Sequence, residues 1–292
     1  MACASCHKAE HGFSDDRVLS EGFDGGHTGR HSMGLTNARF YRPGGFFWDQ
    51  RAGTLEEQVL MPFQDPIEMG MTLDGLITRI GNGDYYPPLF EAAFGDPAIT
   101  PDRVARALAQ FVRSLVSTTS KYDLGRAQVE SRGDPFPNFT DDENFGKFLF
   151  SMPPPAGGFG CFFCHRGEAF IAQTTTSNGL DADSSEDQGY GAVVGTASFQ
   201  GTFKVPSLKN VDLRAPYMHD GRFATLEEVI DHYSDGVQPH PNIGLPFGVI
   251  DGAVPQLQMT VREKRALRAF LRTLTDHDMI TDPRFADPFV RE

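Results

Sequence analysis

All four cysteines of this chain lie in two Cys-x-x-Cys-His pentads, and these pentads carry the most specific chemical signal in the sequence. They are Cys3-Ala4-Ser5-Cys6-His7 and Cys161-Phe162-Phe163-Cys164-His165. Two cysteines three positions apart in a helical turn can form thioether bonds to the two vinyl groups of one porphyrin, and the following histidine can bind the iron. We therefore predict two covalent haem c groups, bound by Cys3, Cys6 and His7 and by Cys161, Cys164 and His165.

A single Cys-x-x-Cys motif also occurs in redox dithiols and as half of a zinc site. In this chain a histidine follows both motifs directly, and no cysteine is left over. Haem attachment is therefore the favoured interpretation, with zinc or a disulfide as the alternatives.

The pentads belong to a longer internal repeat. The pattern Ala-Leu-x-x-Phe-x-Arg-(Ser/Thr)-Leu occurs at residues 107–115 and again at 266–274, at nearly the offset that separates the pentads. Each copy ends on an amphipathic helix that begins at a threonine, Thr100 or Thr260, a residue type favoured at the N-cap. A leading haem-binding helix with a closing helix packed across it is the plan of cytochrome c. We predict two cytochrome c-like domains, 1–130 and 131–292.

The rest of the chain predicts a mainly α protein with long irregular loops. Apolar periodicity predicts helices at 54–63, 73–80, 86–94, 101–117, 140–150, 225–234 and 260–274. The Ser-, Gly- and Pro-rich segment 119–138 is the expected linker between the domains, and 172–203 is expected to be a long surface loop. No run of roughly 18 apolar residues occurs, so no membrane span is predicted.

The formal net charge of −13 disfavours nucleic acid and anionic membranes as partners. It favours a basic partner, such as a small soluble cytochrome or a protein substrate with a lysine patch. Solubility alone is the alternative explanation of the acidity. The 25 phenylalanines could line porphyrin pockets, although each could equally pack in an ordinary core.

The start of the chain bears on its cellular compartment. Haem is attached covalently outside the bacterial cytoplasm, so an export signal is expected, but only Met1 and Ala2 precede the first pentad. The helix predicted at 140–150, before the second pentad, also has no counterpart before the first. We therefore expect a periplasmic protein whose export signal and first helix are absent from this chain. If the natural protein instead began at Met1 and stayed in the cytoplasm, it would not reach the compartment in which haem is attached.

Three further stretches carry a family resemblance. They are 30–37 (Arg-His-Ser-Met to Asn), 47–70 (Phe-Trp-Asp-Gln-Arg-Ala to Glu-Met-Gly) and 203–233 (Phe-Lys-Val-Pro-Ser-Leu-Lys-Asn through Pro-Tyr-Met-His-Asp-Gly to Tyr). Together with the pentads, they resemble the bacterial di-haem cytochrome c peroxidases, a family that includes the methylamine dehydrogenase maturation enzyme MauG. The resemblance covers nearly the whole chain.

The resemblance implies that hydrogen peroxide reacts at the N-terminal haem and that the C-terminal haem stores or relays electrons. Glu68 matches the family's distal glutamate, a group that can move a proton between the two peroxide oxygens. Gln58 and Pro62 match distal-pocket positions. Trp48, the only tryptophan, matches an indole that lies between the haems. Each of these residues also has a simpler interpretation as a packing or solvated position.

The second axial ligand of the C-terminal haem separates the subfamilies. Peroxidase members carry methionine there and MauG-like members carry tyrosine, and the matching residue here is Tyr233. A phenolate stabilises ferric and higher states of iron, whereas a thioether favours ferrous iron. The resemblance therefore implies Tyr233 as an iron ligand. Met218 and His232 are the competing candidates, and Tyr233 could instead stack in the pocket without binding iron.

Two features depart from the family pattern. The loop whose histidine closes the peroxide-side iron in some members has a different length here, and its His27 is expected at the surface. The family's calcium would be bound by the carbonyls of Arg214 and Pro216, but the position of its Asn ligand is His31, a poor calcium ligand. Calcium is therefore an open alternative.

His219 matches a family histidine near the inter-haem region, with a role in orientation or electron coupling.

Three functions remain, in order of preference. The first is a peroxidase that reduces hydrogen peroxide to water with electrons from a small periplasmic cytochrome c or cupredoxin. The second is a MauG-like oxidase that uses peroxide to oxidise residues of a partner protein. The third is a non-enzymatic di-haem electron-transfer cytochrome. The resemblance also makes a homodimer an expectation.

Overall fold

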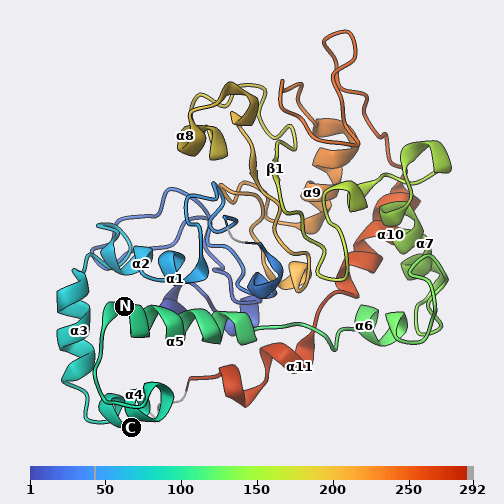
Figure 1. Ribbon diagram of the computed structural model, residues 1–292. Helices are drawn as coiled ribbons and strands as arrows, with labels where there is room; N and C mark the ends of the chain where they lie inside the picture. Colours follow the sequence, from blue (N-terminus) through green and yellow to red (C-terminus); the bar gives the residue numbers. More distant parts are fainter. Residues whose placement is uncertain (43, 288–292) are drawn as a thin grey trace.

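The computed structural model describes residues 1–42 and 44–287, and within them the protein is mainly helical (Figure 1). The α-helices are α1 (Leu55–Gln58), α2 (Met61–Gln64), α3 (Leu73–Gly81), α4 (Tyr86–Phe94), α5 (Pro101–Ser114), α6 (Lys121–Arg126), α7 (Asp141–Ser151), α8 (Tyr190–Val194), α9 (Leu226–Asp231), α10 (Val261–Arg272) and α11 (His277–Ile280). The strands β1 (Thr175–Thr176) and β2 (Phe203–Lys204) pair antiparallel. Both pentads begin with a single 3₁₀ turn, η1 (Cys3–Ser5) and η5 (Cys161–Phe163).

Most of the predicted helices are confirmed, and the differences have local causes. The helix predicted at 54–63 is divided into α1 and α2, because Pro62 has no N–H to donate to the carbonyl of Gln58. The helix predicted at 101–117 ends at Ser114. The helix predicted at 225–234 ends at Asp231, where a π-helical turn, η8 (His232–Gly236), replaces the α-helical bonding.

The two halves of the chain have separate hydrophobic cores. In the first half, α5 packs against α1, and a neighbouring cluster joins residues of α2 to α5. In the second half, α10 packs across α7 around an aromatic cluster. Gly146 permits this close approach, because a Cβ there would lie 1.9 Å from the carbonyl oxygen of Ala266. The boundary at residue 130 stays a prediction.

The segment 119–138, expected as a linker, is instead built into the second half. It contains α6, and its Tyr122 and Phe136 are each only 1% exposed within the α7–α10 core. The segment 172–203, expected as a surface loop, contains β1 and α8 and buries Leu180. The linker expectation failed, whereas the loop lies largely at the surface over 181–199 and is buried only in part. Scattered aromatic and aliphatic residues show no periodicity, yet some find a place in a neighbouring core.

The end of the chain returns to the first half. After α11, the ring of Phe285 packs edge-on against Phe13 and against Phe111 of α5. Figure 1 shows this red segment passing below the two halves. None of the helices in the described residues is long and apolar enough to cross a membrane.

Candidate functional site

The two histidines of the pentads have the same local geometry. The backbone N–H of His7 donates to the carbonyl of Cys3, and that of His165 donates to the carbonyl of Cys161. The Nδ1 atom of His7 lies 3.0 Å from the carbonyl oxygen of Phe13, and that of His165 lies 3.3 Å from that of Phe170.

Because Nδ1 is the donor in each of these bonds, Nε2 of each ring keeps its lone pair and can bind a metal. Phe13 and Phe170 both have a left-handed backbone, with φ of 62° and 53°, which turns their carbonyls toward the histidines. Burial lowers the pKa of His7, and it lowers the pKa of His165 to about 4, so both rings are neutral at neutral pH. Two neutral, oriented imidazoles are what axial haem ligation requires.

The cysteines do not support the alternatives of a disulfide or a zinc site. None of the four cysteines is paired in a disulfide. The described residues contain no group of three or more His, Cys, Asp or Glu side chains placed to bind a metal ion.

A cavity of about 230 Å³ lies beside the second pentad. Its walls are mostly aromatic and aliphatic, and they include Cys161, Cys164, His165, Met218, Tyr233, Phe150, Phe159, Phe203, Phe247, Leu226 and Leu267. Flat apolar walls next to an attachment motif and an imidazole match the chemistry of a porphyrin.

Tyr233 reaches this cavity because of the π-helical turn that follows α9. Such turns often occur at functional positions. The Nδ2 atom of Asn178 lies 3.4 Å from the hydroxyl oxygen of Tyr233 and 3.4 Å from the sulfur of Met218, so both candidate ligands are near the same amide. Burial raises the pKa of Tyr233 to about 12.

His232, the third candidate ligand, is directed elsewhere. Its Nε2 lies 3.1 Å from the carbonyl oxygen of Asn178, and the residue does not line the cavity. Asn178 itself was missed by the sequence analysis. It lies in the segment 172–203, which carried no pattern that could have identified it.

Two buried cations in the cavity wall provide a test of whether haem fits. Lys204 is 6% exposed and Arg214 is 8% exposed, and neither forms an ion pair with a carboxylate among the described residues. The ammonium of Lys204 donates to the carbonyl of Gly45, and the guanidinium of Arg214 donates to that of Ser207 while its Nε has no partner. Burial lowers the pKa of Lys204 to about 7.

Burying unpaired cations is costly, so an anionic group is expected in this cavity. Haem propionates are carboxylates, and the site therefore fits haem on charge as well as on its apolar walls. Gly12 and Gly34 make room for the Arg214 side chain, because a Cβ on either would lie 3.0 Å or less from it.

Near the first pentad, Glu68 is half-buried on the segment after α2. Burial raises the pKa of Glu68, the neighbouring Asp65 raises it further, and Arg51 opposes both. Burial also raises the pKa of the Cys6 thiol, and the carboxylates of Asp15 and Glu68 add to that effect. Gln58 ends α1, half-buried. The catalytic roles of Glu68 and Gln58 stay predictions.

Trp48 is part of a hydrogen-bonded connection between the two halves. Its indole Nε1 donates to the carbonyl of His31 at 2.8 Å, and the N–H of His31 donates to the carbonyl of His219 at 2.8 Å. The His219 ring stacks on Phe203, with centroids 3.8 Å apart, and meets Trp48 edge-on at 6.4 Å. Trp48 and His165 line the same cavity, so the indole lies on the side of the second pentad that faces the first half.

An ion-pair cluster that the sequence analysis missed supports this arrangement. Arg30 donates through Nε and Nη2 to Asp187, at 2.8 and 2.7 Å, and through Nη1 to Asp49 at 2.6 Å. Nε2 of His219 lies 3.8 Å from Asp187, and Arg30 lies over the ring of Phe203. The cluster ties the segment 172–203 to Trp48 and its surroundings.

The residues at the family's calcium position do not fit calcium. His31 is 5% exposed, its Nδ1 lies 3.0 Å from the carbonyl oxygen of Arg17, and its Nε2 lies 3.3 Å from the hydroxyl of Ser14. Both ring nitrogens are therefore engaged with the protein, and no side-chain oxygen takes the place of an Asn ligand. His27 is exposed, as expected, with its backbone paired to Glu21.

Comparison with known proteins identifies relatives of this chain. A family model described as di-haem cytochrome c peroxidase matches residues 1–130. The MauG methylamine utilization protein of Methylorubrum extorquens is 33% identical over 275 residues, which are 94% of this chain and 72% of that protein. The cytochrome c551 peroxidase of Nitrosomonas europaea is 31% identical over 238 residues, covering 79% of this chain and 66% of that protein.

Among solved structures, a MauG-like protein associated with microbial copper homeostasis is 32% identical and superposes with a TM-score of 0.81. The alignment covers 99% of this chain and 87% of that one. The likeness therefore extends over both halves of the chain.

Proposed function

This chain belongs to the di-haem cytochrome c peroxidase and MauG family of oxidoreductases, and from this membership we propose that it is a periplasmic peroxidase with two covalent haem c groups. It reduces hydrogen peroxide to two waters with two protons and two electrons, which a small periplasmic cytochrome c or cupredoxin supplies. The observation that supports this most strongly is the repeated turn that leaves Nε2 of His7 and of His165 free for iron.

His7 and His165 would each hold one haem; the first would supply the iron for peroxide reduction, and the second would supply a further redox centre. Cys3 and Cys6, and Cys161 and Cys164, provide the thioether bonds. The carboxylate of Glu68 accepts a proton from the nearer peroxide oxygen and returns it to the departing one. Its raised pKa brings it toward the range in which it can do both. Trp48 shortens the path between the halves, and calcium takes no part.

A second candidate function is a MauG-like oxidase that removes electrons from residues of a partner protein. The position of Tyr233 favours it, because the phenol shares a cavity with His165 and Asn178 is placed to donate to its oxygen. Burial raises the pKa of Tyr233, and the hydrogen bond from Asn178 opposes that rise. A phenolate ligand would favour the higher oxidation states that such an oxidase has to keep.

Optical and electron paramagnetic resonance spectra of the ferric, haem-loaded protein, before and after one equivalent of hydrogen peroxide, test both candidates. Two low-spin haems that react only after one-electron reduction would support the peroxidase. A high-spin haem beside a low-spin one, giving a long-lived oxidised species without prior reduction, would support the oxidase. No reaction in either state would contradict both functions.

A further inference from the structure

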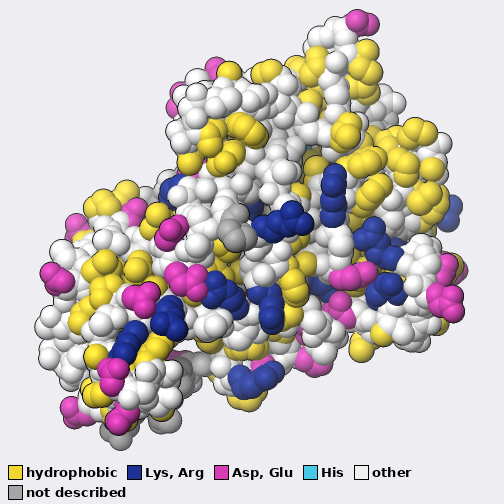
Figure 2. All heavy atoms as spheres, in the orientation of Figure 1, with side chains coloured by type: hydrophobic (Ala, Val, Ile, Leu, Met, Phe, Trp, Pro, Cys, Tyr) yellow, Lys and Arg dark blue, Asp and Glu magenta, His cyan; other side chains and the backbone are white. Residues whose placement is uncertain are grey.

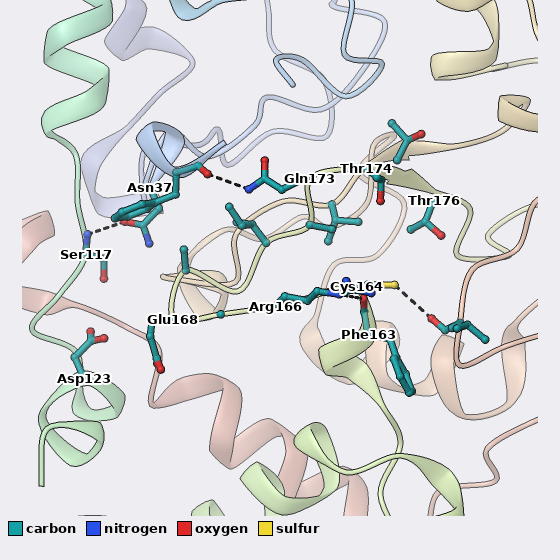
Figure 3. A pocket seen from close by; sticks show the side chains of 18 of the residues that line it. Asn37, Ser117, Asp123, Phe163, Cys164, Arg166, Glu168, Gln173, Thr174 and Thr176 are labelled. Atoms are coloured by element: carbon teal, nitrogen blue, oxygen red, sulfur yellow. Dashed lines mark hydrogen bonds between the residues drawn. The ribbon is translucent and has the colours of Figure 1, made fainter. Parts of the chain in front are cut away.

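A second and larger cavity, of about 660 Å³, lies where the two halves meet (Figure 3). The first half contributes Asn37, Phe40, Ser117 and Thr118, and the second contributes Asp123, Phe163, Cys164, Arg166, Glu168, Gln173 and Thr174. Cys164 lines both this cavity and the one that holds His165 and Tyr233. Cys164 is therefore the part of the redox site that a partner protein in this cavity could approach most closely.

The apolar side chains here are unusually exposed. Phe40 is 45% exposed and Leu245 is 64% exposed, and both line this cavity. An apolar centre surrounded by polar groups is the usual composition of a protein interface.

The charge around this cavity is opposite to that of the whole chain. Arg166 lines the cavity. Arg39 and Arg42 lie on the segment beside it, where the side-chain amide of Gln173 accepts from the N–H of Arg42 and donates to the carbonyl of Phe40. All three arginines are exposed. None of them forms an ion pair within the part of the chain that the structure describes.

The acidic residues of the same cavity are already neutralised. Asp123 pairs with the buried ammonium of Lys209 at 2.5 Å. Glu168 accepts a hydrogen bond from the hydroxyl of Tyr122 and pairs with Arg126 at 3.3 Å. The surface at the cavity is thus locally positive, although the net charge of the chain is −13. Figure 2 shows Lys and Arg side chains gathered across the middle of this face, between the two halves.

We propose that this cavity and its three arginines, Arg39, Arg42 and Arg166, form the docking site for an acidic redox protein, which exchanges electrons with this chain beside Cys164. The proposal rests on the proposed function and identifies the partner's chemistry. Each docking event oxidises the partner by one electron, so two events and two protons balance the reduction of one hydrogen peroxide to two waters. The total charge suggested a basic partner, but its distribution favours an acidic one at this surface.

The test compares an anionic and a cationic reductant on the haem-loaded protein. After oxidation with one equivalent of hydrogen peroxide, re-reduction by hexacyanoferrate(II) and by hexaammineruthenium(II) is followed by stopped flow at low and high ionic strength. We expect the hexacyanoferrate(II) rate to fall roughly tenfold as salt rises, because screening removes the attraction. The hexaammineruthenium(II) rate should stay constant or rise.

At low ionic strength, the double variant R42Q/R166Q should be re-reduced by hexacyanoferrate(II) about as slowly as the native protein is at high ionic strength. The single variant R42Q should show part of this loss of rate. The matched control is R79Q, an exposed arginine on α3 without an ion pair in the described residues. Equilibrium dialysis with the redox-inert anion hexacyanochromate(III) should show the same loss of affinity in the double variant and not in R79Q.

The outcomes separate this proposal from the function on which it rests. If peroxide leaves the spectra unchanged both in the ferric protein and after one-electron reduction, the proposed function is wrong. If peroxide oxidises the protein but the two reductants respond alike to salt, or the double variant behaves like R79Q, only the docking proposal is overturned. A preference for hexaammineruthenium(II) would assign this surface to a basic partner instead.

Discussion

At the scale of single residues, Glu68 is the group whose chemistry can be tested most directly. We expect E68Q to slow the reaction with hydrogen peroxide by about 10²- to 10⁴-fold, because an amide cannot accept the peroxide proton. In the native protein the rate should fall as the pH is lowered through the pKa of Glu68, which burial holds above its usual value, since only the carboxylate accepts a proton. Stopped-flow rates across the pH range measure both effects.

The matched control for this prediction is E91Q, an exposed glutamate on α4. It should leave both the rate and its pH dependence unchanged. If E68Q reacts as fast as the native protein, Glu68 does not transfer the proton.

Site residues could be predicted from the sequence where a contiguous motif contains them, as in the two pentads. Asn178, Lys204 and Arg214 could not be assigned in this way, because their importance comes from being buried together around one cavity. A lone lysine or arginine in a sequence is most often a solvated charge. Only its burial without a carboxylate partner shows that something else has to neutralise it.

At the scale of elements, the Arg30–Asp187 pair fixes the segment 172–203 against Trp48. Although burial opposes it, hydrogen bonding from Arg30 lowers the pKa of Asp187. We expect D187N to reduce the free energy of unfolding by about 1–3 kcal/mol at neutral pH. Because the pKa of Asp187 is lower in the folded than in the unfolded protein, its contribution to the free energy of unfolding is fully present above the unfolded pKa of about 3.9. The difference between variant and native protein should therefore shrink as the pH falls below about 4, measured by denaturant titration.

A spectroscopic measurement shows whether the Arg30–Asp187 pair positions Trp48 or only stabilises the loop. Trp48 is the only tryptophan, so ultraviolet resonance Raman spectra report its indole hydrogen bond to His31 without interference from another indole. D187N should shift that band, whereas D183N, which removes an exposed carboxylate of the same segment, should not. An unshifted band in D187N would mean that the pair stabilises the loop without positioning Trp48.

The helices α3, α4, α7 and α10 were predictable because their apolar residues recur at helical spacing. The segment 172–203 was not, because its structure depends on partners distant in sequence. Asp187 pairs with Arg30, and the side-chain amide of Gln173 bonds the backbone of residues 40 and 42. Such contacts carry no local signal, so the sequence analysis described only an irregular loop there.

At the scale of the whole molecule, Asp276 joins the halves at the end of the repeat. It is 1% exposed and accepts hydrogen bonds from the hydroxyl of Ser117, from the N–H groups of Thr118 and Thr119, and from the hydroxyl of Thr119, at 2.7–3.0 Å. In return, its own N–H donates to Asn210. One carboxylate thus secures the segment that leaves α5 to the segment that follows α10.

We expect D276N to weaken this junction by at least about 2 kcal/mol, because the amide keeps one acceptor oxygen and turns an N–H₂ group toward backbone donors. Since each half has its own core, the loss should separate their unfolding, giving two calorimetric transitions in the haem-loaded protein where the native protein gives one. D278N, on the exposed first turn of α11, is the control and should retain a single transition. If D276N also unfolds in one step at the temperature of D278N, the halves are held together mainly by their haem pockets and by the return of Phe285 to α5.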